Sequence, residues 1–388
     1  MRGRPACFVA TAVLLLGLAV VAAPAAAAPA AVAPGAAGRP SAHAAAPLPT
    51  AYVLVDADTG AVIAQQDART VRPPASTIKL LTALIASQRL TPLDPVPISP
   101  LAEGMPARKI NVKAPQVWAY EHLMRAMMMV SANDAAVALA EKIGGGSLDG
   151  YVQVANETAA RLGLADNPIL NDPSGLDDEF ANKGGARISP RDLAIIARAV
   201  LARPDLMSII GTRDYSFTGG DLLPHHLNNH NLFLDLYPGA TGLKTGATDL
   251  AGKTFVGSAT RGGRTMLVVV FDAFDYYGSA GALIDQGFNT PVSAQANLDH
   301  LPPVVPDAAA PPPTTAVPEV VSSLSGPGAT KSIFDSTGFA VFVLIVGLLP
   351  LRALRRRVIA KTLPPEEYFD DEPPPERPRY RHLAHSGR

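Results

Sequence analysis

A serine that lies three residues before a lysine opens an apolar segment at residues 76–85. Ser76 and Lys79 directly follow Pro73 and Pro74. Prolines ahead of an apolar run mark a helix start, and positions i and i+3 share one face of a helix. Lysine can take the proton of such a serine if burial or nearby positive charge lowers its pKa. The pattern therefore predicts an activated serine, although a helix start with one solvated lysine gives the same four positions.

A second motif could assist this serine. Ser131 and Asn133 lie where the apolar pattern predicts a break between two helices. A second hydroxyl can relay a proton toward a leaving group, and an asparagine amide can hold a substrate carbonyl or orient the lysine. The alternative is a helix cap, because a serine followed by Asn133 and Asp134 would cap a helix well.

The third motif is Lys244-Thr245-Gly246, followed by Ala247. Its polar residues alternate along an edge-like segment, and the glycine allows another backbone to approach closely. A lysine cation and a threonine hydroxyl together suit a carboxylate. An ordinary junction between a loop and a strand has the same composition, so this motif carries little weight alone.

The elements that must position these residues form one predicted domain. Strands are expected at both ends of the region, with amphipathic helices between them. The predicted strands cover residues 51–55, 61–64, 254–259 and 265–271, and the predicted helices cover residues 76–90, two segments within 117–142, 148–162, 190–201 and 279–288. This order indicates one α+β or three-layer domain at residues 49–290, which is long enough for a sizeable core.

Charge and cysteine content exclude several function classes. The chain has 33 Lys and Arg against 34 Asp and Glu, so no basic excess favours nucleic acid. Arg2 and Arg4 precede an apolar stretch and an alanine run, which predicts a signal peptide at residues 1–28; a membrane-spanning anchor is the alternative. The single cysteine, Cys7, lies inside that segment, so cleavage would leave no disulfide or thiol chemistry.

The flanks of the domain are rich in alanine and proline. Residues 29–48 and 291–332 are interpreted as disordered linkers. Residues 333–351 are predicted to form a single transmembrane helix rather than a core or interfacial helix, because no domain surrounds them and their apolar residues cover all faces. The arginines that follow place the disordered tail, residues 352–388, in the cytoplasm, with the domain exported to the cell-wall side.

The three motifs, in this order, resemble those of the serine D-alanyl-D-alanine carboxypeptidases, which are low-molecular-mass penicillin-binding proteins. The resemblance covers residues 50–290 and includes Asn229-His230-Asn231 and Ser189 with Asp192. It implies a β-lactamase/transpeptidase-like α+β fold, with an antiparallel sheet flanked by helices and a helical subdomain. It also implies removal of the terminal D-Ala from peptidoglycan stem pentapeptides, a role in cell-wall biosynthesis and remodelling, and acylation by penicillin.

The resemblance assigns a role to each motif. Ser76 would be the acyl-ester nucleophile and Lys79 its proton acceptor. Ser131 would pass a proton to the departing amine, with Asn133 in the same polar network. The backbone N–H groups of Ser76 and Ala247 would form the oxyanion hole. The substrate-binding residues would be Lys244, Thr245, Gly246 and Ala247. Neither a cofactor nor a metal is expected.

The sequence departs from the family pattern at two places. Ala247 occupies the position after Lys-Thr-Gly where many relatives carry histidine. Residues 275–280 contain no arginine, where many relatives carry one that helps to bind the substrate carboxylate. Both departures bear on how the carboxylate is held and on the turnover rate.

Two other activities are alternatives. A class A β-lactamase would carry a glutamate as its deacylating base, but the nearest look-alike, residues 167–171, ends in Asn171. A penicillin sensor or scaffold would be acylated without turnover and would signal through its tail. Residues 352–388 are short and show no folded domain, which makes a sensor the less favoured reading.

Three histidines lie close together in the sequence, at His225, His226 and His230. A zinc site would need three or four ligands in a fixed geometry. Neither an H-E-x-x-H pattern nor a cysteine accompanies them in this domain. A polar loop is therefore favoured over a metal site.

Overall fold

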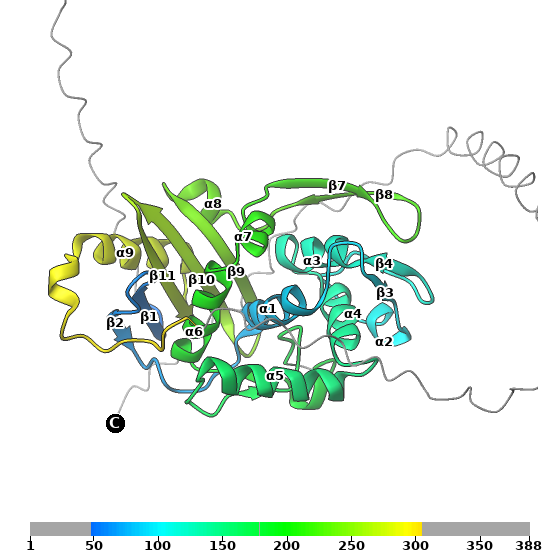
Figure 1. Ribbon diagram of the computed structural model, residues 1–388, viewed down its shortest axis with the longest axis horizontal. Coiled ribbons are helices and arrows are strands. Elements are labelled where there is room, and N and C mark those ends of the chain that lie inside the picture. The colour runs from blue at the N-terminus through cyan, green and yellow to red at the C-terminus, as the bar shows by residue number, and fades with distance from the viewer. Residues whose placement is uncertain (1–47, 178, 305–388) are drawn as a thin grey trace, which may run out of the picture. The chain divides into compact units, whose positions relative to one another are not determined.

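An antiparallel sheet of five strands is the centre of the structure, a computed structural model that describes residues 48–177 and 179–304 (Figure 1). The strands lie in the order β2-β1-β11-β10-β9. β1 pairs with β11 in the register Val53 to Val269, so the two ends of the domain meet in the middle of the sheet. The bounds are β1 Ala51–Asp56, β2 Val62–Gln66, β9 Ala240–Thr248, β10 Gly252–Arg261 and β11 Arg264–Phe271.

Both faces of this sheet are covered, and strand β11 shows why. Its residues from Met266 to Phe271 are all apolar and buried. Successive side chains of a strand point to opposite faces. One face packs against helix α9 (Tyr276–Asn289) through Met266, Val268 and Val270. The other face packs against helix α6 (Pro190–Leu201) and its neighbours through Leu267, Val269 and Phe271.

Helix α1 (Lys79–Arg89) runs through the middle of a helical region beside the sheet (Figure 1). Every residue from Lys79 to Ala86 is buried, because helices surround α1 on all sides. A helix in that position needs small or apolar side chains all round, which the run Leu80 to Ile85 largely supplies. The surrounding helices are α3 Tyr120–Met129, α4 Asn133–Ile143, α5 Leu148–Leu162, α6 and α7 Pro204–Ile210.

Two helix starts follow capping signals in the sequence. At α6, the Ser189 hydroxyl oxygen accepts a hydrogen bond from the N–H of Asp192 at 2.9 Å. At α5, the Ser147 hydroxyl oxygen accepts one from the N–H of Gly150 at 3.1 Å. Such caps satisfy N–H groups that have no partner within the helix. Both helices have the bounds that the sequence predicts.

Several short elements were not predicted from the sequence, and the helix predicted from residue 117 is wrong at its start, because residues 117–119 form a strand and the helix begins at Tyr120. The β7–β8 hairpin extends from the domain beside α3 (Figure 1), where Phe217 packs against His122 and Trp118. These segments are too short for a clear periodic pattern. They are β3 Pro95–Pro97, α2 Pro100–Glu103, β4 Val117–Ala119, β5 Ile169–Leu170, β6 Ala186–Arg187, β7 Asp214–Thr218, β8 Pro224–Asn228 and α8 Phe233–Leu236, with 3₁₀ turns at Ala75–Ile78, Asn182–Gly184 and Val292–Gln295.

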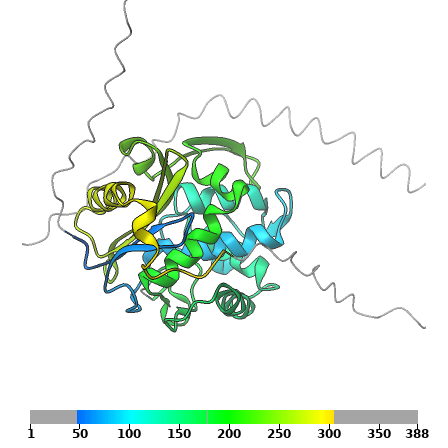
Figure 2. The same cartoon turned by 60° about the vertical axis from the view of Figure 1, so that its left-hand side comes forward.

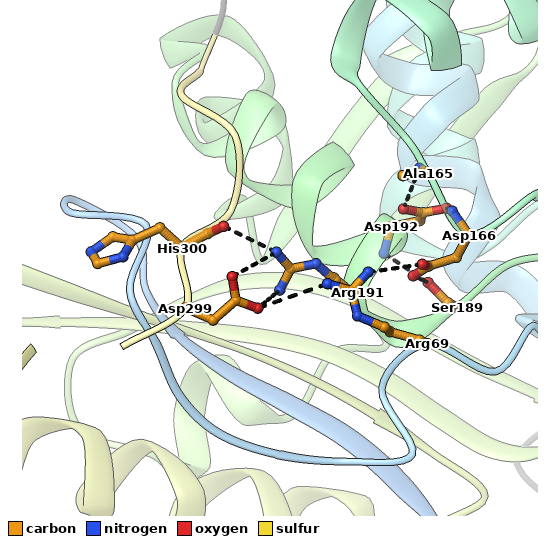
Figure 3. A network of polar contacts seen from close by, with 8 residues as sticks. All are labelled: Arg69, Ala165, Asp166, Ser189, Arg191, Asp192, Asp299 and His300. Atoms are coloured by element: carbon orange, nitrogen blue, oxygen red, sulfur yellow. Dashed lines mark hydrogen bonds and ion pairs between the residues drawn. The ribbon is translucent and has the colours of Figure 1, made fainter. Parts of the chain in front are cut away.

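The domain continues beyond the predicted boundary at residue 290, so residues 291–304 are not a disordered linker. This segment, yellow in Figures 1 and 2, runs back from α9 toward α6. Arg191 of α6 donates to both carboxylate oxygens of Asp299, at 2.7 and 3.2 Å, and to the carbonyl of His300 at 3.0 Å (Figure 3). The side chain of Leu301 is buried nearby. A few anchoring residues hold the segment in spite of its proline content.

Other predicted segments lie outside the described residues. These are the signal peptide (1–28), almost all of the first linker (29–48), the linker from residue 305 to 332, the transmembrane helix (333–351) and the tail (352–388). Across residues 48–177 and 179–304, no helix combines the length and the apolar character needed to cross a bilayer. The proposed anchor therefore stays a prediction.

Replacing Asp299 with alanine is expected to lower the free energy of unfolding by about 1–2 kcal/mol, because the nearly buried Arg191 loses both carboxylate hydrogen bonds. The effect is limited because the Asp299 side chain is 46% exposed and water screens the pair. Urea unfolding of the otherwise intact chain measures it. Asp235→Ala removes an exposed ion pair with Arg213 and should cost less than about 0.5 kcal/mol. Equal losses in the two variants would contradict the role of Asp299 as an anchor.

Candidate active site

A pocket opens where the edge strand β9 meets the start of α1 and the junction between α3 and α4. Its lining brings residues of all three sequence motifs together, although they are far apart along the chain. The sheet order explains this arrangement, because an edge strand leaves one side open to the helical region. The lining residues are Ser76, Ala107, Arg108, Ser131, Asn133, Gly175, Leu176, His230, Thr245, Gly246, Ala247, Thr248 and Tyr276.

Ser76 lies in the 3₁₀ turn that leads into α1. Ala75 before it has a φ of +47°, a left-handed conformation that is uncommon for residues other than glycine and is found at functional sites. Gly246 of β9 lies so close that a Cβ there would be 2.9 Å from the Ser76 backbone nitrogen and 2.5 Å from Thr254 Oγ1. A side chain at position 246 would push β9 away from the serine.

The Lys79 amine is fully buried, and its close polar neighbours are oxygens. Nζ lies 2.8 Å from Ser76 Oγ and 2.8 Å from Asn133 Oδ1, and it also contacts the carbonyl of Ser174. The amide oxygen and the carbonyl can only accept hydrogen bonds. Nζ is placed as the donor to Ser76 Oγ, and the Ser76 hydroxyl donates to the Ser174 carbonyl at 3.4 Å. When the amine is neutral, its two N–H bonds can go to the amide and carbonyl oxygens, and its lone pair can then accept the Ser76 proton. A general base needs this arrangement.

Burial holds the pKa of Lys79 well below its ordinary value of 10.5. Removal of the ammonium group from water is the largest cause, and the positive charge of Lys244 acts in the same direction. The carboxylates of Asp172 and Asp134 oppose both effects, but they are weaker. The amine is therefore available as a base closer to neutral pH than an exposed lysine would be.

The Ser174 carbonyl is a part of the site that the sequence did not predict. Asp172 holds the turn that carries this carbonyl in place. One oxygen of the Asp172 carboxylate accepts hydrogen bonds from the Ser174 N–H at 2.8 Å, the Ser174 hydroxyl at 2.6 Å and the Gly175 N–H at 2.7 Å. These bonds define a tight turn whose carbonyl contacts Lys79. The run Asp-Pro-Ser-Gly does signal a turn. No local signal places that turn beside Ser76.

The helix break predicted near Ser131 is confirmed, since α3 ends at Met129 and α4 begins at Asn133. Ser131 has a φ of +64° and lines the pocket. It does not cap α4, so the helix-cap alternative is wrong. Asn133 contacts Lys79 through Oδ1 and donates from Nδ2 to the Pro106 carbonyl at 3.2 Å. Asn133 thus contacts the lysine in the way needed to orient it, which is one of the two roles predicted for its amide.

Lys244 lies beneath the pocket rather than in its lining. Its side chain is buried, and Nζ donates to the Thr245 carbonyl at 3.0 Å. Burial, together with the positive charge of Arg108, lowers the pKa of Lys244 to about 7. Lys244 is therefore only partly protonated at neutral pH, which weakens it as a partner for a carboxylate. Thr245, Gly246 and Ala247 form the accessible wall.

Comparisons with known proteins agree with this geometry. Residues 38–275, more than half of the chain, match the D-alanyl-D-alanine carboxypeptidase family, peptidase S11. The chain is 36% identical over 260 residues to D-alanyl-D-alanine carboxypeptidase DacB2 of Mycobacterium tuberculosis, covering 64% of this chain and 85% of that protein. It is 32% identical over 227 residues to DacF of Bacillus subtilis, covering 57% of this chain and 56% of that protein.

The chain belongs to the D-alanyl-D-alanine carboxypeptidase family. It spans most of the mycobacterial relative but little more than half of the Bacillus relative. A crystal structure of D-alanyl-D-alanine carboxypeptidase from M. tuberculosis superposes with a TM-score of 0.60 at 31% identity, over 67% of this chain and 99% of that chain. The resemblance indicated by the three motifs is confirmed, as is a fold of sheet and helices like that of penicillin-binding proteins.

Two departures from the pattern of this carboxypeptidase family are visible in the pocket. Ala247 has only a methyl group as its side chain, and Tyr276 lines the pocket from the segment that has no arginine. Arg108, from the loop between α2 and β4, is in the lining instead, with His230 beside it. Sequence reasoning missed Arg108 because it belongs to no motif, and only the folded loop brings it to the pocket.

The three histidines do not gather at one point. His225 lies 3.0 Å from the carboxylate of Asp221, His226 lies 2.9 Å from the Ser216 hydroxyl, and His230 lines the pocket. Within the parts of the chain that the structure describes, no three His, Cys, Asp or Glu side chains are placed to hold a metal ion.

The two buried lysines predict a bell-shaped pH dependence for acylation of Ser76. Lys79 has to be neutral, so the rate rises with pH through its lowered pKa. Lys244 has to be charged to attract a carboxylate, so the rate falls as the pH rises through about 7. Lys244→Arg should remove the alkaline limb and keep the acid limb, because arginine stays protonated. Rates of acylation by a fluorescent penicillin, measured from below to above pH 7, test the prediction.

Lys253→Arg is the matched control for that experiment. Lys253 lies on β10 opposite Ala247 and is not among the lining residues, so its replacement should leave the pH profile unchanged. An alkaline limb that stays near pH 7 in Lys244→Arg would show that another group titrates there.

Proposed function

We propose that the chain is a serine-type D-Ala-D-Ala carboxypeptidase that releases the terminal D-Ala of peptidoglycan stem peptides through an acyl-enzyme on Ser76. The observation that carries the proposal is the buried amine of Lys79, which lies 2.8 Å from the Ser76 hydroxyl beside the pocket. Membership in the family supports the substrate class and a role in cell-wall biosynthesis and remodelling.

The first chemical step forms the acyl-enzyme. Ser76 Oγ attacks the carbonyl carbon of the penultimate D-Ala while Lys79 takes the hydroxyl proton. The backbone N–H groups of Ser76 and Ala247 stabilise the charge that develops on the carbonyl oxygen. The C–N bond then breaks, and the proton passes from Lys79 through Ser131 to the departing D-Ala amine. Ser131 is proposed for this relay because it is one of the lining residues, as is Asn133.

The second step hydrolyses the ester. Lys79 is neutral again once its proton has left with D-Ala. It accepts a proton from the attacking water, and that proton returns to Ser76 Oγ when the ester bond breaks. Asn133 and the Ser174 carbonyl hold the amine in the same place for both steps.

Rapid hydrolysis of penicillin is not expected of this site. A class A β-lactamase activates the deacylating water with a glutamate. Among the residues that the structure describes, no carboxylate lines the pocket. Asn171 is also absent from the lining, and its amide donates to the Lys183 carbonyl at 3.2 Å. The described lining therefore lacks the carboxylate that a class A β-lactamase uses to activate the deacylating water.

The proposed location is the outer side of the cell membrane. It is supported by the apolar start of the chain, the apolar segment at residues 333–351 and the arginines that follow it. The domain would then be exported and held by a single membrane span, with residues 352–388 in the cytoplasm. A cell-wall substrate requires such an exported domain.

Ser76→Ala should abolish covalent labelling by a fluorescent penicillin while the protein remains folded, because the variant loses the hydroxyl that lies 2.8 Å from the Lys79 amine. Labelling is read on a denaturing gel, and folding is checked by circular dichroism. Ser87→Ala is the matched control, since Ser87 lies on the same helix and its hydroxyl donates to the Leu84 carbonyl at 2.9 Å. A label that persists in Ser76→Ala would discard Ser76 as the nucleophile.

Deletion of residues 333–388 should release the domain from the membrane fraction of expressing cells, because the predicted span is removed. Deletion of residues 362–388 alone is the control and should leave the protein in the membrane fraction. Continued membrane retention of the longer deletion would point to the apolar segment near the start of the chain as the anchor.

A further inference from the structure

The charged side chains in and beneath the pocket are positive. Arg108 is part of its lining, and Lys244 lies just beneath it. The lining formed by the described residues includes neither aspartate nor glutamate. Arg108 is exposed. Burial is the larger cause of the lowered pKa of Lys244, and the positive charge of Arg108 acts in the same direction. Such a pocket favours a ligand that carries a negative charge.

The Arg108 side chain is oriented by His230. Its Nη1 lies 3.1 Å from His230 Nδ1. A guanidinium can only donate, so the histidine nitrogen accepts and carries no proton in this arrangement. The pair therefore has one positive charge, on Arg108, whose remaining N–H groups can bind a planar carboxylate in a forked geometry. His230 is itself held, because its N–H donates to the Met129 carbonyl at 2.9 Å.

The loop that carries Arg108 is fixed by the first turn of α4. The Asn133 N–H donates to the Arg108 carbonyl at 2.7 Å, and Asn133 Nδ2 donates to the Pro106 carbonyl at 3.2 Å. Further along the loop, the Asp134 carboxylate accepts the N–H groups of Ile110 and Val112 at 3.1–3.2 Å. Asn133 also contacts Lys79. The position of Arg108 is thus tied to that of the base beside Ser76.

The other cation of the pocket is poorly suited to hold a carboxylate by itself. Lys244 is 2% exposed and has a pKa of about 7, so much of it is neutral where arginine is fully charged. Residues 272–280, which approach the pocket through Tyr276, contain no arginine. Arg108 is the one permanently charged cation among the described lining residues.

We propose that Arg108, oriented by His230, binds the terminal carboxylate of the substrate together with Thr245 and so selects peptides with a free C-terminus. This inference rests on the proposed function, because it names the residue that holds one end of that substrate. Arg108 binds the carboxylate in both the ground state and the transition state, so its loss raises KM more than it lowers kcat.

The test compares Arg108→Gln, Arg108→Lys and the intact chain on diacetyl-L-Lys-D-Ala-D-Ala and on its C-terminal amide. With the free acid, kcat/KM should fall about 10- to 100-fold in Arg108→Gln, mostly through KM. With the amide, the change should stay within about threefold. Arg108→Lys keeps the charge but not the forked guanidinium geometry. Its kcat/KM on the free acid should lie between those of Arg108→Gln and the intact chain. Lys109→Gln, an equal charge change at the next and exposed position, is the matched control.

The outcomes separate this inference from the proposed function. The ratio to compare is kcat/KM on the free acid divided by kcat/KM on the amide. A ratio that drops in Arg108→Gln and not in Lys109→Gln supports the assignment. If the intact chain releases D-Ala and Arg108→Gln has the same ratio, the assignment is wrong and the proposed function stands. Equal losses on acid and amide mean that Arg108 only supports the loop, which also overturns the assignment. An intact chain that takes penicillin on Ser76 but releases no D-Ala overturns both.

Discussion

The catalytic group depends on a lysine amine that is enclosed without a carboxylate partner. Lys79 is completely buried, and the atoms around its nitrogen are a hydroxyl, an amide oxygen and a backbone carbonyl. None of them repays the cost of taking a full positive charge out of water. The pKa of Lys79 is therefore held well below its ordinary value, which favours the neutral amine that can accept the Ser76 proton. Gly246, the Asp172 turn and the start of α4 are all needed to keep this enclosure complete.

The first turn of α4 joins the two halves of the pocket. Asn133 reaches the base through its side-chain oxygen and the Arg108 loop through its backbone N–H and its side-chain nitrogen. Asp134, fully buried, holds the same loop further along through backbone N–H groups. A shift of this turn would move the base and the cationic side of the pocket together. Such coupling keeps the distance between the nucleophile and the substrate-binding groups constant, which proximity-based catalysis requires.

Features that depend on local pattern could be predicted from the sequence. The apolar strands β1 and β11, the capped helices α5 and α6, the break before Asn133 and the grouping of three motifs all have local or ordered signals. The Ser174 carbonyl could not be predicted, because every residue has one and only the fold selects it. The position of Arg108 at the pocket and the burial of Lys244 depend on contacts between distant segments, so neither could be predicted. The prediction of a disordered linker is wrong for residues 291–304, because a few side chains anchor this proline-rich segment.

The segment after α9 also determines where mechanical load would enter the domain. It leaves beside the β1–β2 turn, where Asp299 and Leu301 form backbone hydrogen bonds with Val62 and Gly60. That turn belongs to the opposite edge of the sheet from β9, with three strands between the two edge strands. A pull on the chain after residue 304 would thus reach α6 and β2 before it reached β9. In the proposed membrane-anchored protein, the pocket would then keep its shape while a pull on the chain reoriented the domain.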